Sequence, residues 1–564
     1  MASIEAEKTK RTGNVSSDLD SSDVDQASRP ELPALRFWLL ALSLCLGLLL
    51  SFMDSSIVAT SLFAIGTEFE DMSTVNWVAL SYTLCYLSFA VFYSRLSDVI
   101  GRRDAFATAY LIFFAFSIGC GFAQNMGQLI TCRAFQGIGG SGLYSITMII
   151  LLEVTPARTK QFIASIVGIV LAVGGVLGPV LGGVLTHYTT WRWVFWINGP
   201  IGAVSMVLFC LVWPKAEYLP DIERRTWREL DYLGSFLLIA AAILVVFPFQ
   251  NASSNALFDK AIFLAPLLSG LACCVALMGW EVFVDRCWGD KIAAAFPLRL
   301  LRNRVYSSAL IVTLFLGFPF IMLVYAFPLR LQVVNGKSSL MAGIMLLPML
   351  GASAMGSVLA GIINGKKDRT CETMILSGSL VALGCGLLST LSDSLELEGK
   401  ALGFLVFVGL GFGLAAAGTT MIANLQSSLR DHSPAQGILA QFRILGGSLG
   451  IAASSAILGV TLRSQLAGVV NLSLLQSLEN VGNELTEAQL AAVRHAYSDT
   501  FDEDMRIGAI VACISIVLAL GAWTNPRGRL TIQERQAQHL KDEMERREAV
   551  NSGQERRAPD QGMT

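Results

Sequence analysis

The chain has 564 residues, of which 53% are hydrophobic and only 15% are charged, and its formal net charge at pH 7 is −2. This composition, with a mean hydropathy of +0.57, is too apolar for a soluble protein of this length and indicates a polytopic membrane protein. The small net charge gives no bulk attraction to nucleic acid, and since no phosphate-binding loop, metal-ligand spacing or Ser/His/Asp arrangement indicates an enzyme, we expect no cofactor and no metal.

Both ends of the chain are polar. Residues 1–36 are rich in Ser and Asp and contain no apolar core, so they are not a secretory signal peptide. Residues 525–564 are charged and poor in aromatic side chains. Segments of this composition bury too little apolar surface to fold alone, and we predict a disordered cytoplasmic tail at each end.

Between the tails lie fourteen apolar windows, each close to the ~20 residues that a helix needs to cross a bilayer. They predict an all-α integral membrane protein. The windows are 38–62, 76–94, 105–123, 129–152, 162–186, 193–213, 232–249, 261–284, 305–327, 341–363, 373–391, 402–423, 438–462 and 507–524.

The loops between these windows differ in charge. If the N-terminal tail is cytoplasmic, the inner loops carry 18 Lys and Arg residues and the outer loops carry seven. Because cytoplasmic loops of membrane proteins are enriched in these residues, we predict that both termini are cytoplasmic. The longest outer segment, 463–506, contains Asn471 in an Asn-Leu-Ser sequence, a candidate glycosylation acceptor.

The first window carries the one acid that we place deep inside a span. Asp54 follows Trp38 by sixteen residues, which puts it in the outer half of the first span. The other carboxylates in or beside spans fall at span ends, namely Glu153, Asp231, Glu281, Asp104, Glu372 and Asp504. All four histidines fall in loops or in the C-terminal tail. Charged groups inside spans are costly and usually functional, so Asp54 is a candidate functional residue.

A basic turn follows the second window, where residues 94–103 read Ser-Arg-Leu-Ser-Asp-Val-Ile-Gly-Arg-Arg. Gly101 permits a tight turn, and Asp98 can pair with Arg102 or Arg103 or cap the next helix. Such a charge cluster can hold the cytoplasmic face closed in one conformational state. The simpler interpretation is a positive-inside loop without this role.

Two further motifs lie in the fourth and fifth windows. Residues 133–140 read Arg-Ala-Phe-Gln-Gly-Ile-Gly-Gly, and Arg133 lies about one turn below the outer start of its span. Residues 174–183 contain five glycines and a proline. Glycines at this spacing let two helix backbones approach closely, and a proline bends a membrane helix. The positions that define the motif are Gly174, Gly178, Pro179, Gly182 and Gly183.

A second basic turn, residues 361–369, lies between the tenth and eleventh windows. If the ninth window restarts the pattern, the two turns occupy the same place in two six-span halves. We therefore predict an N-terminal six-helix bundle over 37–213, a linker with two inserted spans over 214–304 and a C-terminal six-helix bundle over 305–524.

Several of these segments together resemble the fourteen-span drug:proton antiporter family of the major facilitator superfamily. The 94–103 turn is similar to its signature cytoplasmic loop, 133–140 to its fourth-span pattern and 174–183 to its fifth-span antiporter motif. Residues 191–202 resemble its sixth-span entry, and 54–58 resemble its first-span motif. The resemblance implies the major facilitator fold around a midplane substrate site. Members of similar sequence are fungal exporters of drugs, toxins and secondary metabolites.

The function that this resemblance implies is proton-coupled export of small hydrophobic molecules by alternating access. Burial disfavours the charged form of Asp54 and Arg133 at a similar depth favours it, so a change of conformation can load and release a proton. The competing interpretation is a permanent Asp54–Arg133 ion pair that only fixes packing. The alternative function is import or vacuolar transport, as by siderophore or basic-amino-acid transporters of the same fold.

Four polar or aromatic residues are candidates for a substrate cavity, with a helix–helix contact as the alternative for each. They are Gln136, Tyr144, Asn198 and Tyr325. Arg443 lies about one turn into the thirteenth span, and we expect it to reach the inner headgroups by snorkelling.

We expect the partners to be a small-molecule substrate, protons and the lipid bilayer, without nucleic acid. We also expect a monomer in the plasma membrane, with the vacuolar membrane as the alternative location.

Overall fold

The computed structural model describes residues 32–71, 74–155, 160–215, 218, 226–255, 261–288, 292, 294–364, 369–393, 399–427, 432–466 and 486–523. Every element of regular structure within these ranges is a helix. Most of the two predicted tails and the candidate acceptor Asn471 lie outside the described residues.

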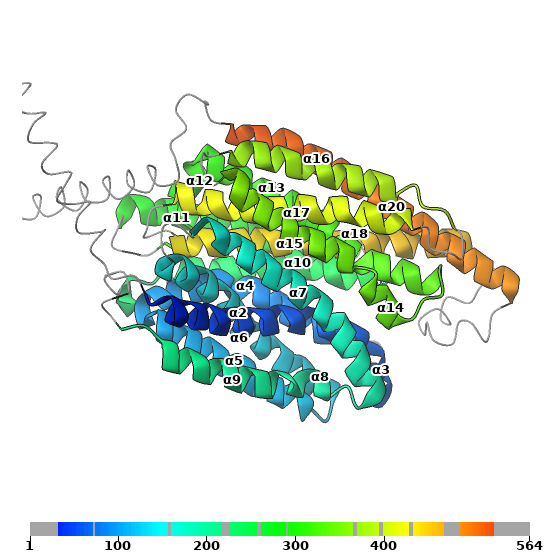
Figure 1. Ribbon diagram of the computed structural model, residues 1–564, viewed down its shortest axis with the longest axis horizontal. Helices are drawn as coiled ribbons and strands as arrows, with labels where there is room; N and C mark the ends of the chain where they lie inside the picture. The colour runs from blue at the N-terminus through cyan, green and yellow to red at the C-terminus, as the bar shows by residue number, and fades with distance from the viewer. Residues whose placement is uncertain are drawn as a thin grey trace, which may run out of the picture.

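The first half of the chain forms helices that alternate in direction along the long axis of the molecule (Figure 1). Their bounds are α2 Ala34–Ile57, η1 Val58–Thr60, α3 Leu62–Glu68, α4 Asn76–Ile100, α5 Arg102–Gly121, α6 Met126–Val154, α7 Lys160–Tyr188, α8 Trp193–Trp196 and α9 Asn198–Val212.

The linker and the second half follow. The linker contains η3 Trp227–Glu229, α10 Tyr232–Asn255 and α11 Ala261–Cys287, and α12 Leu298–Arg302 leads into the second half. The second half contains α13 Arg304–Val333, α14 Ser339–Ile344, α15 Leu347–Asn364, α16 Thr370–Leu388, α17 Lys400–Gln426, α18 His432–Leu466, α20 Glu487–Ala519 and η7 Leu520–Ala522.

The predicted all-α fold of two six-span bundles and an inserted pair is confirmed. Fourteen helical stretches of the described chain are long and apolar enough to cross a membrane. Helices α2 to α9 surround one apolar core, and helices α13 to α20 surround another. Helices α10 and α11 pack against each other, and α10 also contacts α4 of the first bundle and α18 of the second.

The two ends of the molecule differ in how the bundles meet. We call the end where α2 begins and α20 ends the tail end, and the opposite end, where α3 and α14 lie, the distal end (Figure 1). Toward the tail end, a Cβ built on Gly437 of α18 would lie 3.1 Å from the Val91 side chain of α4. Val91 also shares one apolar cluster with Phe296 of the linker and Ala435 of α18. Both bundles and the linker are therefore joined near the tail end.

Several span boundaries differ from the prediction, because hydropathy windows miss polar or interrupted helix segments. The last span belongs to a helix that begins at Glu487 rather than at 507, where Thr486 forms a capping box with Gln489. The tenth span consists of two helices, α14 and α15. Pro348 lies at the second position of α15, where its missing N–H has no helical partner to lose.

Candidate functional site

Asp54 and Arg133 form an ion pair inside the first bundle. The Arg133 Nη1 group contacts Asp54 Oδ2, and both side chains have 0% exposed area. Asp54 lies 20 residues after Ala34 in α2, and Arg133 lies seven residues after Met126 in α6. At 1.5 Å per residue, the pair is about 30 Å from the tail end of α2 and about 10 Å from the distal end of α6. The structure therefore brings together, in the distal half, the two residues that the sequence selected.

Neutral groups enclose this ion pair. Asn198 of α9 donates from Nδ2 to Asp54 Oδ1 at 2.9 Å. Arg133 donates to Gln136 Oε1 at 2.9 Å and to the Val78 carbonyl oxygen at 3.0 Å. Because burying two charges costs several kcal/mol per ion even when they are paired, these additional hydrogen bonds are needed to offset the loss of water.

The four residues predicted for a substrate cavity lie in different surroundings. Gln136 and Asn198 face the ion pair, with exposed fractions of 0% and 1%, and Tyr144 is 6% exposed. Tyr325 of α13 is 49% exposed. Contact with a substrate stays a prediction for all four.

Three tyrosine rings connect the ion pair to the second bundle. The Arg133 guanidinium carbon lies 4.2 Å from the centre of the Tyr82 ring. The rings of Tyr82 and Tyr86 stack with centroids 5.7 Å apart, and those of Tyr86 and Tyr144 are 6.2 Å apart. We call these three residues the tyrosine row. At its far end, the Tyr144 hydroxyl accepts a hydrogen bond from Arg443 of α18 at 3.3 Å.

The position and hydrogen bonds of Arg443 differ from the prediction. It lies eleven residues after His432, because α18 begins before the predicted window. Its guanidinium donates to Tyr144 and, at 3.4 Å, to the Ala416 carbonyl oxygen of α17. The expectation that Arg443 snorkels to the inner headgroups is therefore wrong, since its side chain is bonded between the bundles.

The glycine motif of α7 packs on the part of α2 that carries Asp54. A Cβ built on Gly174, Gly178 or Gly182 would collide with or crowd the α2 backbone, and at Gly178 it would lie 2.9 Å from the Met53 carbonyl oxygen. The α2 residues whose carbonyl oxygens these glycines meet are Leu49, Met53 and Ile57. Gly178 and Gly182 are therefore required for the close approach, and a side chain at Gly174 would crowd the same backbone.

The other two positions of the motif lie off this face. A Cβ built on Gly183 would have no atom within 4 Å. Pro179 lies beside α14, where a Cβ on Gly343 would be 4.0 Å from the proline ring. The close packing against α2 therefore depends on three of the five predicted positions.

The basic turn after α4 forms a charge cluster at the tail end. Gly101 has a φ of 94°, in the region that favours glycine. Arg102 donates to Asp98 at 2.6 Å and pairs with Glu153, at the end of α6, at 2.9 Å. Arg103 is exposed. Glu153 was not predicted to take part, because its spacing from the turn carries no sequence signal. The role of the cluster in holding one face closed stays a prediction.

The segment before α12 is held from three sides. We call residues 294–296 the linker loop. Arg95 of α4 donates to the carbonyl oxygen of its first residue. Asp231, just before α10, accepts from the amide of its second residue at 3.4 Å, and Glu281 of α11 accepts from the amide of its third at 2.7 Å. The inserted helices thus fix a loop that contacts the predicted basic turn.

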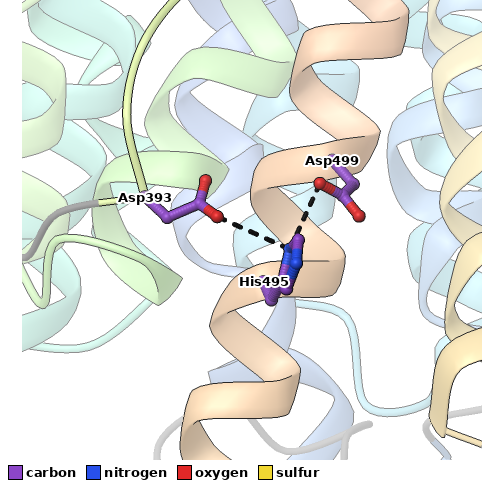
Figure 2. A group of neighbouring side chains, drawn as sticks. All are labelled: Asp393, His495 and Asp499. Atoms are coloured by element: carbon purple, nitrogen blue, oxygen red, sulfur yellow. Dashed lines mark ion pairs between the residues drawn. The ribbon is translucent and has the colours of Figure 1, made fainter.

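A further group of titratable side chains lies near the start of α20 and is drawn in Figure 2. His495 Nδ1 is 3.5 Å from Asp393 Oδ2 and 3.2 Å from Asp499 Oδ1. The potential ligand atoms lie within 4.8 Å of one another. The sequence did not predict this group, because we placed His495 in a loop and the structure places it in α20. The side chains are 40% to 62% exposed, so the contacts are those of a solvated surface ion pair.

Two charged residues that were assigned to outer loops or span boundaries are buried in the second bundle. Arg330 of α13 is 2% exposed and donates to the Ser392 carbonyl oxygen at 2.9 Å. Asp504 of α20 is 1% exposed and accepts from Ser454 of α18 at 2.5 Å. Hydropathy windows missed both because the helices that carry them extend beyond the apolar segments.

Comparison with known proteins identifies the architecture. The family model described as "Major Facilitator Superfamily" matches residues 44–453 of the chain. The chain belongs to this superfamily. It is therefore a multi-pass membrane protein that transports small molecules, and the family indicates a transporter rather than an enzyme.

Named fungal transporters are similar over most of their length. The MFS-type transporter FPY5 of Fusarium mangiferae is 34% identical over 501 residues, which is 86% of this chain and 83% of that protein. The MFS-type efflux pump LUC4 of Fusarium sp. is 28% identical, with 82% of each chain covered. The efflux pump hmp6 of Hypomyces subiculosus is 28% identical, with 87% of each chain covered. These relatives place the transporter among proteins of the fungal efflux-pump type.

A solved structure supports the fold alone. A bacterial homologue of the human lysosomal transporter Spinster, in an inward-facing and unoccupied conformation, is 15% identical and covers 88% of the transporter with a TM-score of 0.53.

Proposed function

We propose that the transporter exports small hydrophobic molecules in exchange for protons and that Asp54 carries the proton. The observation that supports this most is the second set of acceptors around Arg133. Gln136 and the Val78 carbonyl oxygen both accept from the guanidinium. When Asp54 becomes protonated, Arg133 therefore keeps hydrogen bonds to neutral groups. Protonation of Asp54 therefore does not leave Arg133 as a buried cation without hydrogen-bond partners. Such a cation would be costly inside a membrane protein.

The proposed cycle uses the enclosure of the pair. In the conformation described, Asp54 has no exposed area, so a proton can reach it only after the surrounding helices move. Opening toward one side hydrates Asp54, weakens its attraction to Arg133 and lets a proton bind, and opening toward the other side lets that proton leave to water before closure restores the pair. Alternation between the two states couples proton entry to cargo exit.

The proposal includes direction and location. The tail end faces the cytoplasm, cargo leaves through the distal end, and the protein works as a monomer in the plasma membrane. The loop charges favour this orientation, and two relatives that are named efflux pumps favour export. Import and vacuolar loading are the alternative directions.

Flux in proteoliposomes tests the coupling. Three probes are used, ethidium as a cation, Nile red as a neutral molecule and 2-naphthalenesulfonate as an anion, with pH gradients of either sign. We expect Asp54→Asn to abolish gradient-driven flux of every probe that the wild type moves, while exchange without a gradient persists. Asp104→Asn, in the exposed first turn of α5, is the matched control. Undiminished gradient-driven flux in Asp54→Asn would refute the proposal.

A double variant separates proton coupling from packing. Asp54→Asn combined with Arg133→Gln replaces the ion pair by neutral side chains that can still bond to each other. If the pair only fixes packing, the double variant regains gradient-driven flux. If Asp54 carries the proton, the double variant folds and exchanges cargo but remains uncoupled.

A further inference from the structure

Arg443 is a cation between the two bundles, and its position is firmly set. A Cβ built on Gly317 of α13 would lie 2.6 Å from the Arg443 carbonyl oxygen, so α13 packs directly on the backbone at this point. Arg443 follows His432 by eleven residues and Tyr144 precedes Val154 by ten. Both therefore lie about 15 Å from the tail end, near the middle of a bilayer about 30 Å thick.

The charge of Arg443 has no carboxylate partner among the described residues. Arg133 pairs with Asp54, and Arg102 pairs with Glu153. Arg443 instead makes two long hydrogen bonds, of 3.3 Å to Tyr144 and 3.4 Å to a carbonyl oxygen of α17. A guanidinium has five N–H donors, so most of them remain available. Its side chain also keeps part of its surface exposed, although it lies between helices of both bundles.

Aromatic residues occur in both bundles within one or two helix turns of the Arg443 contacts. Tyr86 and Tyr144 belong to the first bundle, and their ring centroids are 6.2 Å apart. In the second bundle, Phe320 and Phe412 stack with centroids 3.6 Å apart. Phe320 is three residues from Gly317, and Phe412 is four residues from the α17 carbonyl that Arg443 contacts, so each lies one turn away on the same helix face. A cation with free donors, one helix turn from these aromatic residues, favours a molecule with an apolar body and one negative charge.

We propose that Arg443 is a substrate-recognition residue and that the cargo of this transporter consists of amphiphilic organic anions, whose acidic group pairs with the guanidinium. This proposal rests on the proposed function, because it names the class of molecule that the proposed exporter carries. It does not depend on proton coupling. The tyrosine row then connects the cargo site to the Asp54–Arg133 pair by direct ring contacts.

Binding to the purified full-length protein in lipid nanodiscs tests the assignment. The probes share one ring system: 2-naphthalenesulfonate, the neutral 2-naphthalenesulfonamide and the cationic trimethyl(2-naphthyl)ammonium. Equilibrium dialysis at constant pH measures each affinity. We expect the wild type to bind the anion at least about tenfold more tightly than the neutral probe, because hydrogen bonds to a charged group add that much. Arg443→Gln should lose this preference and leave the affinity for the neutral probe unchanged.

Two further variants keep the result interpretable. Arg463→Gln, at an exposed position in the last turn of the same helix, is the matched control and should bind like the wild type. If Arg443→Gln does not fold, Arg443→Lys decides, since it keeps the charge but loses the planar fork. It should weaken anion binding without affecting the neutral probe. Equal anion affinity in the wild type and the folded Arg443 variant would overturn the proposal, as would a wild type that does not prefer the anion or does not bind it. Because no pH gradient is applied, failure here is distinguishable from failure of proton coupling.

Discussion

Gly178 of α7 lies so close to Met53 of α2 that a Cβ added to the glycine would be 2.9 Å from the methionine carbonyl oxygen. The next residue of α2 is Asp54. The fifth-span motif therefore fixes the backbone from which the acidic side chain projects. Its glycines determine where the carboxylate lies, although none of them touches the carboxylate itself.

This contact gives a prediction about stability. Gly178→Ala should force α7 away from α2 and destabilise the transporter by about 1–3 kcal/mol, the usual cost of overpacking. Gly183→Ala is the matched control from the same motif, because no atom would lie within 4 Å of its new Cβ. Thermal unfolding in nanodiscs measures both. Equal melting temperatures for the two variants would contradict the prediction that Gly178 is needed for α7 to pack on α2.

Asn198 gives a prediction about stability. It donates to Asp54 Oδ1 at 2.9 Å. Asn198→Leu removes the donor and leaves one buried carboxylate oxygen without this partner, which should cost about 1–3 kcal/mol in the free energy of unfolding. Thermal unfolding in nanodiscs checks this. Ser117→Ala, which removes the hydroxyl that Asn198 also contacts at 3.0 Å, should cost less. An Asn198→Leu variant as stable as the wild type would contradict a structural role for this hydrogen bond.

The Arg102–Glu153 pair predicts an energetic coupling between the basic turn and α6. The two side chains are 14% and 17% exposed and approach to 2.9 Å. A double-mutant cycle with Arg102→Gln and Glu153→Gln should give about 1 kcal/mol of coupling in unfolding free energy. The Asp285–Arg299 pair, which is more exposed and 3.7 Å apart, should give a value near zero. A coupling of zero for Arg102–Glu153 would mean that the turn and α6 act independently.

The hydrogen bonds of Asp231 give a prediction about the stability of the linker. Its Oδ1 accepts from the Gly234 amide at 2.7 Å and from Trp280 Nε1 at 2.9 Å, in addition to its contact with the linker loop. Asp231→Ala leaves these donors unpaired and should cost about 1–3 kcal/mol for each donor left without a partner. Thermal unfolding and protease sensitivity near residue 294 measure the effect. Asp231→Asn keeps an acceptor and should lose less stability than Asp231→Ala. An Asp231→Ala variant as stable as the wild type would disprove the prediction.

The sequence predicted the architecture because hydropathy alone marks fourteen spans. The sequence also identified Asp54 and Arg133 as candidate site residues, because few charged residues lie within the apolar windows and these two lie at similar depths in the membrane. It did not predict the place of Arg443, because its partner Tyr144 is 299 positions away. The contacts of the linker loop were missed for a different reason. They involve backbone groups, which leave no trace in residue identity.

The linker loop has a consequence for the role of the inserted helix pair. An inserted helix pair might be regarded as removable, since each bundle has its own apolar core. Here Asp231 and Glu281 hold the amides of a loop whose carbonyl accepts from Arg95. Excising residues 232–287 would remove Glu281 and leave the Phe296 amide without this acceptor, so we expect the shortened chain to be less stable. The inserted pair is therefore tied into the fold, because its removal would disturb a loop that also bonds the buried Arg95 of the first bundle.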